Sequence, residues 1–414
     1  MFNIKKSISG INALCLIDFL NYFYVLTRIN SKIIMILSSP QIKKTKDGVV
    51  YEVHISDSSY PDRIWYQVKD RFGDFLSDTL DAALVALIIP AMHRKEDIIL
   101  RGKVAESLLF HINNDVQAIY SIFHPHLIKI TVHADHVYNQ ATQTANVATG
   151  FSGGVDSFHT LENHYYAENI SPGFKITHLL YNNVGSHGGG GEGLCAERYH
   201  RLKILPRRLG IPFIVVNTNL NEFYKDYSFI QSHTPRDASV GLALQNGLGK
   251  YLYSSSINYH HLTIAPGKVI TFSDSIILPK LSTPAMQLMS AGSAVSRVEK
   301  IIQVAELPDS REFLDVCIDE TNKSNCSYCL KCMKTQLTLE VIGKLDRYNK
   351  VFDNKVYQKE RTRFITSIHR SKSIHLNEIL ELARKNNHPL PILKTKIFSY
   401  LRVYGILKRL SLKK

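Results

Sequence analysis

The sequence predicts an α/β protein built around a parallel sheet that carries helices on both faces. Short apolar runs alternate with helix-like segments between residues 146 and 300, as strands and helices do in parallel sheets. Apolar residues make up 44% of the 414-residue chain and charged residues 21%, which is ordinary for a globular protein. This length suffices for two or three domains. We therefore expect a small α+β domain before the sheet, and a cysteine-rich loop and a helical tail after it.

The first 34 residues are ambiguous. The run from 11 to 26 is apolar and aromatic, but Asp18 and Asn21 interrupt it, so it makes a poor transmembrane helix. It is also not followed by the small-residue cleavage site of a signal peptide. We expect residues 1–34 to be either an extension ahead of a true start at Met35 or an ordinary helix. A membrane anchor stays open as the less favoured alternative.

Residues 35–145 predict the small α+β domain. Alternating apolar, aromatic and β-branched residues indicate strands, and apolar residues at helical spacing indicate helices. The expected strands cover 49–56, 64–72, 97–102 and 127–137, and the expected helices cover 79–94 and 104–123. We assign no chemistry to this domain.

Residues 146–345 predict the ligand-binding domain. A helix is expected to begin near Ser293 or Ser296, with Arg297 in its first turns, where its charge could neutralise a phosphate or a carboxylate. Ligands in parallel α/β sheets bind at the carboxyl ends of the strands, so Asn182, near the end of the second strand, is expected at the site. The expected strands cover 147–151, 176–183, 212–219 and 251–256, and the expected helices cover 156–168, 194–210 and 236–249.

A glycine-rich run from Gly185 to Gly193 follows the second of these strands. So many glycines cannot hold one conformation without a large entropic cost. Because the run begins beside the expected ligand site, we predict a lid that orders over the ligand. A flexible surface loop is the alternative.

The strongest signal is the sequence Phe-Ser-Gly-Gly-Val-Asp-Ser at 151–157, between the first strand of this domain and a helix. Gly153 and Gly154 allow a tight turn that aims backbone N–H groups and the start of the helix at one point, which suits a phosphate. Ser152 and Ser157 add hydroxyl donors, and Asp156 adds a carboxylate that could hold Mg²⁺. The spacing is not that of a Walker A loop, which ends in Lys-Ser or Lys-Thr.

Four of the six cysteines fall close together, at Cys317, Cys326, Cys329 and Cys332. Their x8, x2 and x2 spacings allow four thiolates to close a tetrahedral zinc site. Such a site has no open position, so we expect Zn²⁺ to be structural and to fix the loop near the active site. An iron–sulfur cluster is the alternative.

The glycine turn resembles the phosphate-binding loop of the PP-loop ATP pyrophosphatase superfamily, the adenine nucleotide alpha hydrolase-like proteins. Together with the cysteine spacing, it is most similar to the 7-cyano-7-deazaguanine synthase-like family, over about residues 147–345. The resemblance implies a Rossmann-like fold with ATP bound at Ser152, Gly153, Gly154, Val155, Asp156 and Ser157, and zinc bound by the four cysteines. It also implies catalytic roles for Asp156 and Ser157, and for Arg297 if it matches the arginine that the family keeps there.

The activity implied by the resemblance is ATP-dependent adenylation of a carboxylate with release of pyrophosphate, followed by nitrogen transfer. The expected partners are a small carboxylate substrate and ammonia or an amine donor, with ATP, Mg²⁺ and Zn²⁺ as cofactors. An alternative is an ATP-binding protein, or a tRNA- or nucleic-acid-modifying factor. We expect a cytoplasmic enzyme and not a membrane protein. A homodimer is one assembly that the enzyme could form.

The C-terminal tail, 346–414, predicts basic helices. Lys and Arg outnumber Asp and Glu by 50 to 36 in the chain, and residues 355–414 alone hold 15 basic and 3 acidic residues. This charge suits a nucleic acid or another anionic partner. Equally, the tail could be a solvated helical surface or an amphipathic helix docked on its own catalytic domain.

Overall fold

The computed structural model describes residues 34–186, 191–319, 324–369, 371 and 373–390. Three predictions therefore fall wholly or partly outside the described residues. They concern the extension at 1–33, the middle of the glycine-rich run at 187–190, and the end of the basic tail at 391–414.

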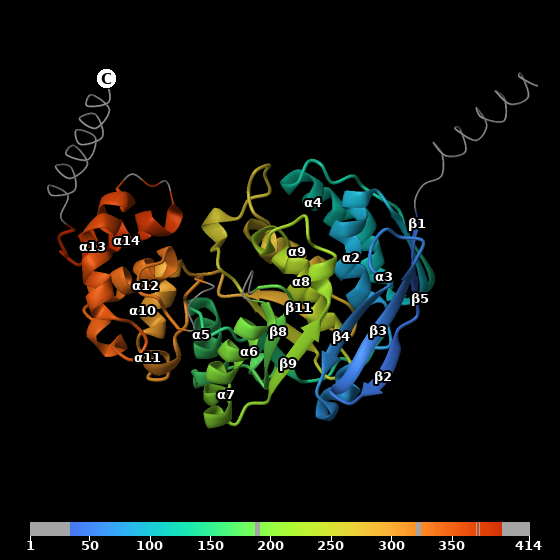
Figure 1. Ribbon diagram of the computed structural model, residues 1–414, viewed down its shortest axis with the longest axis horizontal. Coiled ribbons are helices and arrows are strands. Elements are labelled where there is room, and N and C mark those ends of the chain that lie inside the picture. The colour runs from blue at the N-terminus through green and yellow to red at the C-terminus, as the bar shows by residue number, and fades with distance from the viewer. Residues whose placement is uncertain (1–33, 187–190, 320–323, 370, 372, 391–414) are drawn as a thin grey trace, which may run out of the picture.

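The described residues contain one mixed sheet of eleven strands, which extends from the middle of the molecule to the end opposite the C-terminal helices (Figure 1). Its order is β11-β10-β7-β8-β9-β4-β3-β1-β5-β6, with β2 paired to β3. The strands are β1 (Ile34–Ser38), β2 (Gln41–Thr45), β3 (Gly48–Ser56), β4 (Arg63–Val68), β5 (Asp97–Ala105), β6 (Val132–Tyr138), β7 (Val147–Gly150), β8 (His178–Asn183), β9 (Phe213–Thr218), β10 (Lys250–Ser254) and β11 (Gln287–Ala291).

The four strands expected between 146 and 256 form a parallel block with β11, a strand that the sequence analysis did not predict. The sheet as a whole is not parallel, so the predicted fold class needs correction. Strand β4 pairs antiparallel with β9 through Tyr66–Thr218 and Gln67–Asn217, and β3 pairs antiparallel with β4. The strands of the predicted N-terminal region thus extend the same sheet.

Helices cover both faces of the parallel block, as predicted. Leu179 and Tyr181 of β8 belong to one hydrophobic core and Leu180 to another, because successive side chains of a strand point to opposite faces. The Leu180 core includes side chains of α2 (Asp81–Arg94), α8 (Phe229–Ala243) and α9 (Asp274–Lys280). The other core includes side chains of α5 (Val155–Leu161), α6 (Gly191–Leu202), α7 (Ile204–Leu209), α10 (Arg297–Val304) and α12 (Leu330–Val341).

Helix α8 begins seven residues earlier than predicted, at Phe229 and not at Arg236. Ser228 and Gln231 form a capping box that starts the helix, and Pro235 lies inside it. A proline at this position leaves the carbonyl of Gln231 without its helical donor. That oxygen lies 3.3 Å from His124 Nε2, which provides a replacement partner.

The expected elements between 35 and 145 form with shifted ends. Strand β4 ends at Val68, and a 3₁₀ turn covers Asp70–Phe75, where the strand was expected to continue. The expected helix at 104–123 is α3 (Glu106–His111), a π turn and α4 (Gln117–Phe123). Helix α2 contains Pro90, and the carbonyl of Ala86 that it frees accepts a hydrogen bond from Tyr224 Oη at 2.7 Å.

The C-terminal helices gather at one end of the molecule, drawn in orange and red in Figure 1. They are α11 (Ser310–Phe313), α12, α13 (Asn354–Ile368) and α14 (Ile374–Lys385). Glu340 of α12 accepts hydrogen bonds from Tyr357 Oη at 2.6 Å and from Arg361 Nε at 2.8 Å, which fixes α13. The described part of the tail is therefore docked on the body of the protein. No helix within the described residues is long and apolar enough to cross a membrane.

Candidate functional site

A cleft of about 980 Å³ opens at the carboxyl ends of β7, β8 and β10. This size is within the range of small-molecule sites. The glycine turn, the end of β8, helix α8, strand β10, helix α10 and the cysteine loop all contribute to its walls. The residues that matter below are Ser152, Gly154, Asp156, Ser157, Asn182, Asp237, Tyr251, Tyr253, Arg297, Asp315, Cys317 and Lys331.

The glycine turn has the geometry that its sequence predicts. Gly153 has φ +73°, and a Cβ there would come within 2.6 Å of Leu202 Cδ2 and 3.2 Å of the Phe313 carbonyl oxygen. Only glycine can adopt this left-handed conformation and also leave room for these neighbouring atoms without strain. Helix α5 then begins at Val155 and points its first turn at the cleft.

The hydroxyls and the apolar residue of this turn have different environments. Ser152 is exposed at the cleft mouth, and its Oγ accepts from Gly154 N at 3.3 Å. Ser157 is buried, and its Oγ donates to the Gly154 carbonyl oxygen at 2.9 Å. The Val155 side chain packs in the hydrophobic core, so only its backbone could contact a ligand.

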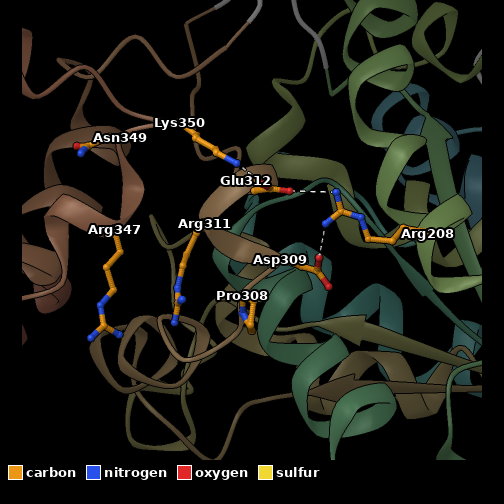
Figure 2. A pocket seen from close by; sticks show the side chains of 8 residues that line it. All are labelled: Arg208, Pro308, Asp309, Arg311, Glu312, Arg347, Asn349 and Lys350. Atoms are coloured by element: carbon orange, nitrogen blue, oxygen red, sulfur yellow. Dashed lines mark hydrogen bonds and ion pairs between the residues drawn. The ribbon is translucent and has the colours of Figure 1, made fainter.

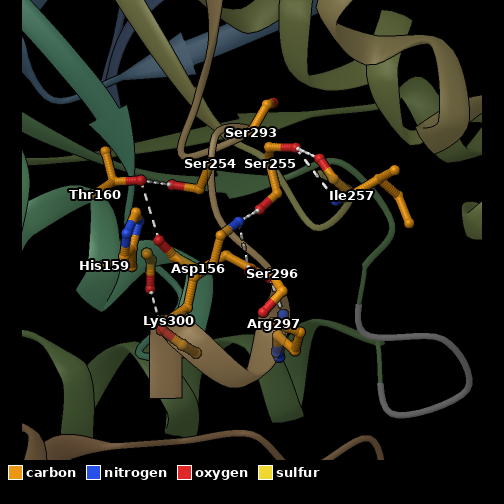
Figure 3. A network of polar contacts seen from close by, with 12 residues as sticks. Asp156, His159, Thr160, Ser254, Ser255, Ile257, Ser293, Ser296, Arg297 and Lys300 are labelled. Carbon is orange, nitrogen blue, oxygen red and sulfur yellow. Dashed lines mark hydrogen bonds and ion pairs between the residues drawn. The ribbon is translucent and has the colours of Figure 1, made fainter. Parts of the chain in front are cut away.

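Asp156 is held by two cations from helix α10. Its carboxylate forms an ion pair with Arg297, and the second oxygen lies 3.5 Å from Lys300 Nζ (Figure 3). Lys300 is only 1% exposed and also donates to the Ser255 carbonyl oxygen. Burial alone would raise the pKa of Asp156, but the charges of Arg297 and Lys300 outweigh it, so the pKa lies below its usual value.

This arrangement depends on the start of α10. The Ser296 side chain accepts from Glu299 N at 3.2 Å, and the Glu299 carboxylate accepts from Ser296 N at 2.6 Å. This capping box begins the helix at Arg297, as the sequence predicted for one of its two candidate caps. Arg297 and Lys300 are then three residues apart, on one helix face.

The cleft walls carry an excess of positive charge. Asp315 is paired with Arg201, as Asp156 is with Arg297. Lys331, in the first turn of α12, also lines the cleft. Desolvation within the cleft lowers the pKa of Lys331, and the nearby charge of Arg297 lowers it further. Such walls suit an anionic ligand.

Three polar side chains lie together across the base of the glycine turn. Asn182 Nδ2 donates to Asp237 Oδ1 at 2.8 Å and to Tyr251 Oη at 3.2 Å. A Cβ on Gly150, the last residue of β7, would lie 3.1 Å from Tyr251 Oη. The hydrogen-bonded chain therefore passes over the end of the strand that leads into the turn. Burial raises the pKa of Asp237 to about 6.

The cysteine group contributes Cys317 to the cleft wall. All four sulfur atoms lie within 4.8 Å of one another, with Cys317–Cys329 at 4.0 Å and Cys326–Cys332 at 3.9 Å. Tetrahedral Zn²⁺ with Zn–S bonds of about 2.3 Å places its sulfurs about 3.8 Å apart. The four thiols could therefore hold a metal such as zinc. Because Cys317 also lines the cleft, the loop is part of the site, as expected.

A second hollow, of about 370 Å³, lies between α7, α11 and the segment after α12 (Figure 2). Four basic side chains and two carboxylates line it, and both carboxylates take part in ion pairs. Arg208 donates to Asp309 at 2.8 Å and to Glu312 at 3.0 Å, and Lys350 pairs with Glu312. We interpret it as an ion-pair network that joins surface elements.

The structure thus brings most of the predicted site residues to one cleft. Sequence reasoning missed Lys300, Lys331 and Asp237. Lys300 could have been found, because it is three residues after Arg297 on a capped helix. Asp237 could not have been found in this way. The helix was predicted to begin at Arg236, one residue before Asp237, whereas it begins at Phe229.

The fold and the site define an α/β protein with a glycine turn at a basic cleft and a four-cysteine group that could hold a metal. No protein-family model, curated protein or solved structure matches this chain.

Proposed function

We propose that this protein uses ATP to adenylate a carboxylate, releases pyrophosphate, and then transfers nitrogen to the activated carbon, as a 7-cyano-7-deazaguanine synthase-like ligase does. One observation carries the proposal. The glycine turn opens into the same basic cleft as Arg297 and Lys331, so backbone donors and basic side chains face one ligand.

In this mechanism the phosphates of ATP bind at the turn from Ser152 to Ser157. Negative charge develops on the departing pyrophosphate when the substrate carboxylate attacks the α-phosphorus. The backbone N–H groups of the turn, together with Arg297 and Lys331, stabilise that charge. Because the turn and the Asp156-paired Arg297 are held in place before the reaction, they need little reorganisation in the transition state.

Asp156 contributes indirectly. Both of its oxygens face cations of α10, so the carboxylate does not fit the Mg²⁺ role expected for it. Instead it orients Arg297 toward the cleft, and the buried Lys300 fixes Asp156 from behind. Any Mg²⁺ would come with the nucleotide, since Mg²⁺ commonly binds substrate phosphates.

Zn²⁺ in the cysteine group would be structural. The sulfur spacing fits a closed tetrahedral site, which has no position for a substrate. Its effect on the cleft would be to hold Cys317 and Lys331 in the wall.

The test is to separate the products of ATP turnover by the purified full chain, with and without 7-carboxy-7-deazaguanine and ammonium. We expect AMP and pyrophosphate. Arg297→Met should reduce pyrophosphate formation by about 100-fold, because it removes a charge that acts in the transition state. Arg208→Met is the matched control, because Arg208 pairs with Asp309 and Glu312 outside the cleft.

ADP and phosphate as products would contradict the proposal, as would ATP binding without turnover. Pyrophosphate that forms without the deazapurine acid would keep adenylation and reject that particular substrate. Equal losses in Arg297→Met and Arg208→Met would show that the loss is not specific to the cleft.

A further inference from the structure

Three carboxylates line the cleft in the described part of the chain, and they differ in their partners. Asp156 pairs with Arg297, and Asp315 pairs with Arg201. Asp237 makes no ion pair with any described residue, and its one hydrogen bond comes from the neutral amide of Asn182. It is therefore the one of these three carboxylates that forms no ion pair within the described residues.

Burial raises the pKa of Asp237 more than the charge of the neighbouring Arg236 lowers it, and the Arg236 guanidinium hydrogen-bonds other groups. It donates to Ser232 Oγ, the Val184 carbonyl oxygen and Asn221 Oδ1, each at 3.0 Å, and it stacks on the Tyr224 ring at 4.1 Å. These contacts hold the guanidinium in the cleft wall.

Asp237 is also close to the place where the chemistry would occur. Its partner Asn182 ends β8, Tyr251 lies on β10, and β7 runs between those two strands. The hydrogen-bonded chain crosses Gly150, only one residue before the turn begins at Phe151. A group bound at the turn and extending into the cleft would therefore meet Asp237.

We propose that Asp237 is the catalytic base that takes a proton from the attacking nitrogen in the second step, a role that rests on the proposed function. The nitrogen lone pair forms a C–N bond with the acyl carbon of the adenylate. The acyl C–O bond breaks, and AMP leaves with that electron pair. One N–H proton moves to an oxygen of Asp237 and is later released to water.

The remaining titratable neighbours are compatible with this role. Tyr251 and Tyr253 of β10 face Asp237, and burial raises the pKa of both phenols, so they stay neutral. Asp274 of α9 also lies nearby, and burial raises its pKa to about 8. With a pKa of about 6, Asp237 is ionised at neutral pH yet holds a proton better than an ordinary carboxylate.

The experiment compares full-length wild type with Asp237→Asn, which keeps the shape and removes the basic oxygen. Adenylation is followed by pyrophosphate–ATP exchange with 7-carboxy-7-deazaguanine. Nitrogen transfer is followed with ammonium, and separately with hydroxylamine. Hydroxylamine attacks acyl adenylates without much help from a base, so it reports whether the adenylate forms.

We expect Asp237→Asn to reduce amide formation about 100-fold, within the usual range for general-base catalysis, and to reduce hydroxamate formation far less. At a fixed concentration of free ammonia, wild-type amide formation should rise with pH through about 6, and the variant should lack that limb. Asp237→Glu, which restores a carboxylate, should recover part of the rate. Thermal unfolding and zinc content check that each variant is folded.

Amide formation at the wild-type rate in Asp237→Asn would overturn the role of Asp237 alone. The same conclusion would follow if exchange, hydroxamate and amide all fell together in a folded variant. Absence of pyrophosphate exchange and of hydroxamate in the wild type would overturn the proposed function, and the role of Asp237 with it.

Discussion

Two buried aspartates of this protein, Asp156 and Asp274, have pKa values shifted in opposite directions, and their neighbours determine the direction. Asp156 is buried beside two cations, which keeps its pKa low. Asp274 is 1% exposed, and its Oδ1 accepts from Thr234 Oγ1 at 2.7 Å, while its Oδ2 is buried without a protein partner. Burial then raises the pKa of Asp274 to about 8, so its neutral form is favoured at neutral pH.

Asp274 should therefore make folding pH-dependent. Its pKa is about 8 when folded and about 3.9 when unfolded, so the folded state binds more protons between these values. Its contribution to stability is complete below about pH 4 and declines as the pH rises through 8. We expect wild-type unfolding free energy to fall by about 2–4 kcal/mol between pH 5 and 8 from this group.

Asp274→Asn should reduce the fall in unfolding free energy between about pH 5 and 8, which is measured by urea unfolding at a series of pH values. Asp62→Asn changes an exposed carboxylate and serves as the control, which should keep the wild-type slope. An unchanged slope in Asp274→Asn would refute a protonated Asp274.

At the scale of elements, short motifs were read correctly where their physics is local. The helix cap and the glycine turn both depend on neighbouring residues. The turn forms as predicted, and the cap falls at Ser296, one of the two predicted candidates. Helix α8 was expected to begin at Arg236, directly after Pro235, and proline is common in the first turn of a helix. In the structure Pro235 lies inside the helix, and His124, more than 100 residues away, provides a partner for the freed carbonyl. A prediction from neighbouring residues alone could not include this contact between His124 and Gln231.

Gly153→Ala tests the turn. The substitution places a Cβ in a left-handed conformation and 2.6 Å from Leu202 Cδ2, so the turn must shift. We expect ATP affinity to fall at least about tenfold and unfolding free energy to fall by about 1–2 kcal/mol. Gly173→Ala is the control, because nothing lies within 4 Å of its Cβ position. Isothermal titration with ATP gives the result, and wild-type affinity in Gly153→Ala would contradict the proposed phosphate site.

Metal removal tests the cysteine group. If the group holds zinc, the purified protein should contain about one zinc per chain. Cys326→Ser should lose it and unfold more easily, because metal binding contributes to the folding of the loop. Cys195→Ala, a buried cysteine outside the group, should keep the metal. Elemental analysis with thermal unfolding measures both, and a metal-free wild type of unchanged stability would contradict a structural zinc site.

At the scale of the whole molecule, the parallel block could be predicted from alternating apolar runs, but the extent of the sheet could not. The pairing of Tyr66 with Thr218 joins residues more than 150 positions apart, and sequence periodicity carries no information on it. The join is also polar. Asn219 Oδ1 accepts from Trp65 N at 3.0 Å, and Asn219 Nδ2 donates to the Arg63 carbonyl oxygen at 3.0 Å. One core contains side chains from both regions.

This shared core predicts that both regions unfold together. Trp65, the single tryptophan of the chain, lies at the join, so its fluorescence reports on that join while far-UV circular dichroism reports on the whole. The two urea transitions should coincide. Asn219→Ala leaves the Trp65 N–H and the Arg63 carbonyl without partners and should shift both transitions equally, by about 1–3 kcal/mol. Asn114→Ala, an exposed asparagine bonded to Phe110, should shift neither. A fluorescence transition at lower urea, with most of the dichroism retained, would instead mean that the N-terminal strands fold as a separate unit.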